Sequence, residues 1–252
     1  MRWFGFGCAA QFKVADIYDI LHSMELRELK KQHVRADLGI DAEFGGILTV
    51  IDFGNVNFWF DEDRQNAEHQ AMPEDEKLRI NLSSLYDFCG LFSEHIRFYY
   101  GHDAQKRESI AFITAARHIF GKRVFTKPIQ KVRHHLSAEE IGSNKRSTFV
   151  DKEGLYVHLP KCNFDVEISV DAIRLLEQYD TLAMFSGDSD FASLVRYLKR
   201  NGKKVILFKA GFIASDLRDA ADKVISAQNI KRHIAQVVKK QKPGFKPGLA
   251  NR

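Results

Sequence analysis

Four aspartates in three separate segments have the residue type and the position to do chemistry. Asp52 follows the apolar run ILTVI, and Asp165 opens the pattern DVEISVDAI. Asp188 and Asp190 follow the apolar run LAMF. Two unscreened carboxylates about 4 Å apart repel by about 4 kcal/mol at an effective dielectric constant near 20, so a fold that gathers four needs a cation or shared protons. Their hard oxygen atoms suit Mg²⁺ or Mn²⁺, and such a cation beside a phosphate ester indicates metal-assisted phosphoryl chemistry.

The stretch from residue 181 to residue 202 predicts the corner that carries the aspartate pair. Residues 182–185 form a short apolar run, as in a strand buried on both faces. Asp188 is a good helix N-cap, a carboxylate at Asp190 is favoured in the first turn, and Gly202 is placed to end the helix. The two aspartates could also serve only as a cap and a dipole partner. In an open α/β sheet, however, such corners lie where ligands bind.

The rest of the chain alternates between strand and helix patterns, which predicts βαβ units and a mainly parallel sheet. Asp171 lies about one and a half turns after Asp165, so a regular helix cannot point both at one site. We therefore expect Asp171 either to support the site residues from behind or to have a purely structural role. The expected strands are 47–51, 96–100, 122–129, 147–160 (two short strands) and 204–208, and the expected helices are 73–89, 104–120, 165–176, 190–201 and 215–225. Residues 134–147 show no clear element and are expected to form a loop.

The composition bounds the class of protein. A chain of 252 residues that is 44% hydrophobic is long enough for one substantial α/β domain with extensions. The three cysteines are far apart, which favours reduced thiols and a cytoplasmic location over a disulfide framework or a zinc module. No run reaches the roughly 18 apolar residues that a membrane span needs, so no membrane partner is expected.

The expected domain organisation has three parts. Residues 1–45 are expected to form a helical extension without recognisable chemistry, residues 46–230 the main α/β domain, and residues 231–252 a basic flexible tail. The tail from Lys231 to Arg252 carries seven basic residues and no acid, and the region from Arg117 to Arg146 carries eight against two acids. Both regions are candidates for contacts with an RNA backbone. The sequence leaves open whether the chain forms a homodimer.

Four motifs in a fixed order resemble the NYN domain of the PIN-like ribonuclease superfamily, and most closely its LabA-like bacterial branch. They are IDFGN at 51–55, KCNFDVEISVDA at 161–172, FSGDSDFASLVRYLKRNGKKVIL at 185–207 and, more weakly, SDLRDAAD at 215–222. The resemblance implies a Rossmann-like, three-layer α/β/α domain with a central, mainly parallel sheet. It also implies an acidic pocket for Mg²⁺ or Mn²⁺, in a group that contains RNA endonucleases.

The resemblance also implies roles for individual residues. Asn55 would orient Asp52 or the substrate, and Ser186 would help to bind phosphate. Lys161 matches the family's lysine before the central aspartate, but three residues rather than two separate it from Asp165. The acids implied to bind metal and activate water are Asp52, Asp165, Asp188 and Asp190.

Three other functions are compatible with parts of this pattern. A regulatory module of the same fold could bind RNA without cutting it. A haloacid-dehalogenase-like phosphatase needs a second aspartate two residues after its nucleophile, where this chain has Gly54. A toxin of a toxin–antitoxin pair fits the superfamily but is less natural for a chain of this length with extensions. The leading hypothesis is therefore a metal-dependent endoribonuclease.

Overall fold

The computed structural model of the protein describes residues 14–144 and 146–240. The chain divides into two compact units between Glu43 and Phe44. The first unit contains the long helix α1 (Val14–Leu38), and the short 3₁₀ helix η1 (Ala42–Phe44) lies at the division. The helical extension expected before residue 46 is thus present over its described part.

A six-stranded sheet forms the centre of the second unit, with the order β10-β9-β8-β1-β3-β4. Every neighbouring pair is parallel, which confirms the predicted parallel sheet. The strands are β1 (Ile47–Asp52), β3 (His95–His102), β4 (Val124–Pro128), β8 (Thr181–Phe185), β9 (Lys204–Lys209) and β10 (Lys223–Ser226).

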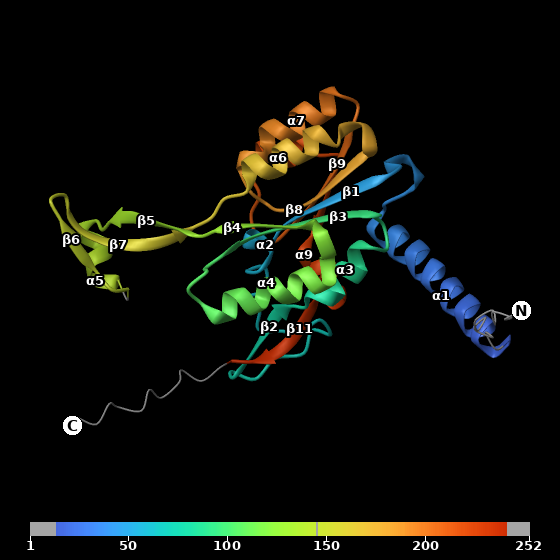
Figure 1. Ribbon diagram of the computed structural model, residues 1–252, viewed down its shortest axis with the longest axis horizontal. Helices are drawn as coiled ribbons and strands as arrows, with labels where there is room; N and C mark the ends of the chain where they lie inside the picture. The colour runs from blue at the N-terminus through green and yellow to red at the C-terminus, as the bar shows by residue number, and fades with distance from the viewer. Residues whose placement is uncertain (1–13, 145, 241–252) are drawn as a thin grey trace, which may run out of the picture. The chain divides into compact units, whose positions relative to one another are not determined.

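Helices cover both faces of this sheet, as the predicted three-layer α/β/α domain requires (Figure 1). On one face lie α6 (Asp165–Arg174) and α7 (Ala192–Arg200), with α8 (Ser215–Ala220) packed against α7. On the other lie α3 (Leu82–Cys89) and α4 (Arg107–Phe120), with α9 (Ala227–Ile234) packed against α3. The remaining short helices are α2 (Phe53–Val56), η2 (Gly121–Arg123), η3 (Leu176–Gln178) and η4 (Ser189–Phe191).

The apolar runs before Asp52 and before Ser186 form the two central strands, β1 and β8, which are buried. All five residues of β8 are buried, and Phe185 stacks on Phe208 of β9 with ring centroids 4.2 Å apart. In the parallel register, Ile51 of β1 pairs with Phe185 at the end of β8. The residues that follow these two positions, Asp52 and Ser186, therefore emerge side by side at one edge of the sheet.

A second, antiparallel sheet of order β5-β7-β6 extends beyond β4, and we call residues 130–161 the arm (Figure 1). It consists of β5 (Gln130–His135), α5 (Ala138–Ser143), β6 (Phe149–Asp151) and β7 (Gly154–Lys161). The two strands expected within 147–160 are confirmed, whereas the loop expected at 134–147 is wrong. Ser137 and Glu140 form a capping box that starts α5. The strand β5 forms by pairing with β7, which lies about 20 residues further along the chain.

A third sheet pairs β2 (Glu76–Ile80) with β11 (Ala235–Lys239) in antiparallel fashion. Three expectations for these parts of the chain are wrong. The helix expected from Pro73 begins only at Leu82, where Asn81 caps α3 by accepting a hydrogen bond of 3.0 Å from the Ser84 backbone. The single helix expected after Ser215 is instead α8, the strand β10 and α9. The flexible tail expected from Lys231 is wrong up to Lys239, because α9 and β11 occupy this stretch, and residues 241–252 lie outside the described part.

Within the described residues, no helix combines the length and the apolar character that crossing a membrane requires.

Candidate functional site

Three aspartates converge at the edge of the sheet where the parallel strands end. One carboxylate oxygen from each of Asp165, Asp188 and Asp190 lies within 4.8 Å of the others. Asp165 opens α6, while the other two belong to the corner between β8 and η4. Oδ1 of Asp188 accepts a hydrogen bond of 3.1 Å from the backbone of Asp190, so this corner is the helix cap that the sequence predicts.

Asp52 lines an acidic pocket of about 290 Å³ together with Asp165 and Asp188. The hydroxyl of Ser186 donates a hydrogen bond of 3.3 Å to Oδ2 of Asp52 and accepts one of 3.3 Å from the backbone of Asp188. Burial raises the pKa of Asp52 to about 6, and the charges of Asp165 and Asp188 add to this rise. Hydrogen bonds from the Asn55 backbone and from Ser186 oppose the increase in pKa. Asp52 is therefore the carboxyl whose proton is held most readily near neutral pH.

Asp165 is fixed by a neighbour that sequence reasoning missed. Asn163 donates a hydrogen bond of 2.6 Å to Oδ2 of Asp165 and accepts one of 2.7 Å from the Asp165 backbone. Partial burial raises the pKa of Asp165, the bond from Asn163 lowers it, and the charges of Asp188 and Asp190 raise it further. The signal in the sequence was an asparagine two residues before a helix-opening aspartate, which is the spacing of an Asx turn.

Lys127 is a second residue that sequence reasoning did not single out, although it lies within the basic region. Its ammonium group forms an ion pair of 2.6 Å with Glu167 and lies 4.7 Å from the ring centroid of Phe164. The positive charge of Lys127 also lowers the pKa of Asp165. Lys127 stands near the carboxyl end of β4, so the parallel topology that gathers the acids could have indicated it.

The three predicted substrate-binding residues all lie at this site. Asn55 and Lys161 line the acidic pocket, and Ser186 bridges two of its acids. The side-chain oxygen of Asn55 accepts a hydrogen bond of 3.0 Å from the indole of Trp59, which fixes the orientation of the amide. Its backbone N–H, rather than its side chain, contacts Asp52. Lys161 is exposed and has no ion-pair partner among the described residues.

This arrangement agrees with a comparison against known families, in which the model of the NYN domain matches residues 63–230. The chain belongs to the NYN domain family. The matched segment contains Asp165 and the aspartate pair, whereas the IDFGN motif with Asp52 precedes it. The match thus covers the segments that carry three of the four acids at the edge of the sheet.

Two curated relatives match shorter parts of this NYN protein. The low amplitude and bright protein LabA of Synechococcus elongatus is 32% identical over 87 residues, which cover 34% of this chain and 47% of LabA. An uncharacterized protein of Methanocaldococcus jannaschii is 31% identical over 119 residues, which cover 41% of this chain and 49% of that protein. The chain therefore matches about half the length of each relative.

Among solved structures, a protein of unknown function from Vibrio parahaemolyticus aligns with a TM-score of 0.49 at 19% sequence identity. The alignment covers 74% of this chain and 95% of that protein.

Proposed function

We propose that this NYN protein is a metal-dependent endoribonuclease that hydrolyses phosphodiester bonds of RNA at its aspartate cluster. The observation that carries the proposal is the approach of the Asp165, Asp188 and Asp190 carboxylates to within 4.8 Å of one another. Membership of a family that is generally nuclease-like supports the same function.

The donor set of the pocket fits a divalent cation. All three converging groups offer hard carboxylate oxygens, which Mg²⁺ and Mn²⁺ prefer, and their mutual repulsion is relieved by a bound cation. Asp165, Asp188 and Asp190 would hold the ion, and Asp52 is the fourth acid that lies near them. Such an ion, when bound, polarises the phosphodiester and stabilises charge on the leaving oxygen.

The side chains around this centre have separate tasks in the proposal. Asp52 is the proposed general base that accepts the proton of the attacking water, because it is the most buried of the four acids and its carboxylate is held by Ser186. Ser186 and the Asn55 backbone keep Asp52 in one orientation. The Asn55 amide and the exposed ammonium of Lys161 contact the phosphate of the substrate from the wall of the pocket. The positive charge of Lys127 offsets part of the negative charge of the acidic pocket and so reduces its repulsion of the RNA phosphates.

RNA is the proposed partner, and the region from Arg117 to Arg146 is proposed to hold its backbone through Lys127 and the arm. The chain from Lys231 to Arg252 remains a second candidate for backbone contacts, although its first nine residues belong to α9 and β11. The cytoplasm is the proposed compartment, and the free thiols of Cys89 and Cys162 are compatible with it.

The test is incubation of the purified protein with single-stranded and hairpin RNAs in the presence of Mn²⁺, Mg²⁺ or EDTA. The proposal expects cleavage with one or both metals and none with EDTA. Salt-sensitive RNA binding without cleavage under any of these conditions would support the rival function, a regulatory RNA-binding module. It would also overturn the assignment of these acids to hydrolysis.

A further inference from the structure

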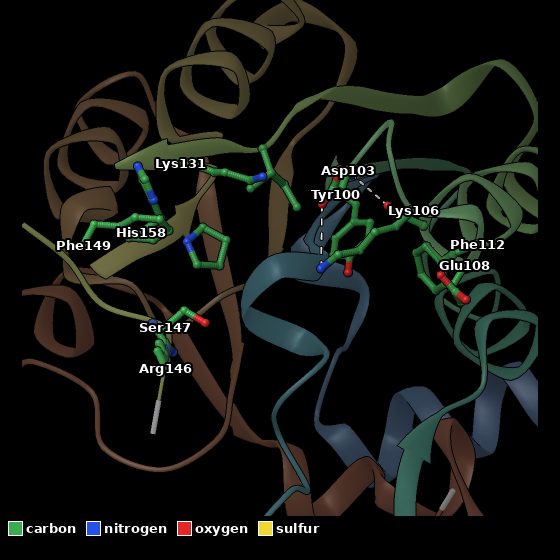
Figure 2. Close-up of a pocket in the computed structure, with 13 residues that line it drawn as sticks. Tyr100, Asp103, Lys106, Glu108, Phe112, Lys131, Arg146, Ser147, Phe149 and His158 are labelled. Carbon is green, nitrogen blue, oxygen red and sulfur yellow. Dashed lines mark hydrogen bonds and ion pairs between the residues drawn. The ribbon is translucent and has the colours of Figure 1, made fainter. Parts of the chain in front are cut away.

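A cleft of about 840 Å³ separates the arm from the part of the domain formed by β3 and α4 (Figure 2). One wall carries Tyr100, Lys106 and Phe112, and the arm supplies the opposite wall with Phe149 and His158. Pockets for small organic ligands range from about 300 to 1,000 Å³, so this cleft has room for a nucleotide.

The arm carries an aromatic side chain, Phe149, that is held by neighbouring rings and is still partly exposed to solvent. Phe149 is 45% exposed, although it stacks on Tyr156 at 5.6 Å and meets the edge of His158 at 4.9 Å. These contacts hold the ring in one orientation on β6. A fixed, half-exposed ring gives a base a stacking partner with little loss of side-chain entropy on binding.

The opposite wall is also aromatic and is fixed by the core of the domain. Phe112 on α4 stacks on Phe53 with centroids 5.2 Å apart and meets Tyr100 edge-on at 4.8 Å. Figure 2 shows Phe112 and Tyr100 across the cleft from Phe149 and His158. The cleft therefore has aromatic side chains on both of its walls.

The charges of the cleft are few and placed at its sides. Lys106 forms an ion pair of 3.7 Å with Asp103. Lys131 and Arg146 line the arm side, and neither side chain has an ion-pair partner among the described residues. With Glu108 as the other acid, the cleft carries three cations against two carboxylates. This slight positive excess suits one or two phosphates that flank a base better than a dense phosphate cluster.

The cleft and the acidic pocket share one strand. His158 and Pro160 of β7 line the cleft, and Lys161, the last residue of β7, lines the acidic pocket. Three residues of a strand span about 10 Å, so His158 and Lys161 lie close enough for one nucleic acid chain to reach both places. Gly101, which follows the cleft residue Tyr100 on β3, also lies close to the acidic pocket, because a Cβ added at Gly101 would fall 2.6 Å from Sγ of Cys162.

From this geometry we infer that the cleft binds a base of single-stranded RNA, whose backbone passes Lys161 and enters the acidic pocket. The inference rests on the proposed function for the class of its ligand. Phe149 stacks on the base, while Lys131 and Arg146 contact the flanking phosphates. The arm is then the part of this domain that selects unpaired RNA, because a base inside a duplex cannot enter the cleft.

The inference is tested by fluorescence anisotropy with a labelled single-stranded RNA and with an abasic oligonucleotide of the same length, both in EDTA. Phe149→Ala is expected to weaken RNA binding about tenfold or more, because it removes a base–aromatic stack. Phe149→Trp is expected to keep the affinity. The matched control Val150→Ala changes a residue that is 75% exposed on the same strand and does not line the cleft, and its affinity is expected to equal that of the unchanged protein.

Two further readouts separate stacking from charge. Binding of the abasic oligonucleotide is expected to be weak and insensitive to Phe149→Ala. Lys131→Gln is expected to reduce the slope of log affinity against log salt by about one, whereas Phe149→Ala leaves this slope unchanged. Equal RNA affinity of Phe149→Ala and Val150→Ala would overturn the inference. The anisotropy assay contains EDTA and therefore measures RNA binding alone. The proposed hydrolysis is tested separately, by the incubation with Mn²⁺ or Mg²⁺.

Discussion

Tyr99 donates a hydrogen bond of 2.6 Å from its hydroxyl to Oδ2 of Asp171, and this bond ties β3 to α6. Arg97 donates to the same oxygen from Nη2 at 2.8 Å and from Nε at 3.2 Å. Because α6 begins with Asp165, the network fixes the helix that carries one acid of the site. Asp171 therefore has the structural role that its spacing from Asp165 predicts.

The first prediction concerns this network. Asp171→Ala removes the carboxylate that accepts hydrogen bonds from the Tyr99 hydroxyl and pairs with the charge of the half-buried Arg97, so the free energy of unfolding is expected to fall by about 2–3 kcal/mol. Urea unfolding measures this change. Asp219→Ala is the matched control, since Asp219 pairs with Arg218 on an exposed surface and its loss is expected to change stability little. Equal losses in the two variants would contradict the structural role.

The second prediction concerns the pH dependence of stability at Asp52. Its pKa rises from 3.8 to about 6 on folding, so the stability that this group contributes is complete below about pH 4 and is lost as the pH rises through 6. Asp52→Asn imitates the protonated form. In EDTA at pH 8 the free energy of unfolding of the variant is therefore expected to be about 3 kcal/mol higher than that of the unchanged protein, with little difference near pH 4.

Thermal unfolding at the two pH values measures this prediction, and RNA cleavage by Asp52→Asn is expected to be lost at the same time. A variant that is less stable than the unchanged protein at pH 8 would show that burial does not raise the pKa of Asp52 as described.

The third prediction concerns Lys127, whose charge lies near the acids. Lys127→Gln makes the pocket more negative, so Mn²⁺ is expected to bind up to about fivefold more tightly while RNA binds more weakly. Isothermal titration with Mn²⁺ and anisotropy with RNA measure the two effects. Lys122→Gln, an exposed lysine of η2 that has the same charge, serves as control and is expected to leave Mn²⁺ affinity unchanged. Weaker Mn²⁺ binding by Lys127→Gln would contradict the account.

The fourth prediction concerns Lys231, which the sequence places in a flexible tail. Its ammonium group forms an ion pair of 2.7 Å with Asp63, and the Lys231 side chain is only 8% exposed. Lys231→Ala leaves Asp63 without its cation, and the free energy of unfolding is expected to fall by about 2–4 kcal/mol. Lys239→Ala, on the exposed side of β11, is expected to have little effect in the same unfolding experiment. A small effect of Lys231→Ala would show that this end of the domain contributes little to stability.

The parts of the fold that the sequence predicts correctly depend on short-range patterns. The buried run before Ser186, the cap at Asp188 and the helix stop at Gly202 each act within a few residues, and Gly202 has the positive φ of 74° that a helix end favours. Parallel strands also bring their carboxyl ends to one edge. Asp52, Asp165 and the aspartate pair could therefore be assigned to one site before the structure was known.

The incorrect parts depend on partners far away in the chain. Residues 76–80 look like the start of a helix, but they pair with 235–239, and residues 130–135 pair with β7. A local pattern contains no information about such partners, so both strands were missed. Lys127 and Asn163 were missed for a related reason. Their importance comes from where the topology places them, beside Asp165, and residue type alone does not show this.

The measurement that tests the central claim most directly compares Asp188→Asn with Asp87→Asn in RNA cleavage with Mn²⁺ and in RNA binding. Asp188 lies in the aspartate cluster, whereas Asp87 is an exposed acid of α3 and controls for the loss of one negative charge. The account predicts that Asp188→Asn loses cleavage by a factor of at least about 100 and binds RNA as well as or better than the unchanged protein. Asp87→Asn is predicted to retain both properties. Cleavage by Asp188→Asn at the rate of Asp87→Asn would contradict the claim that these carboxylates form a hydrolytic metal centre.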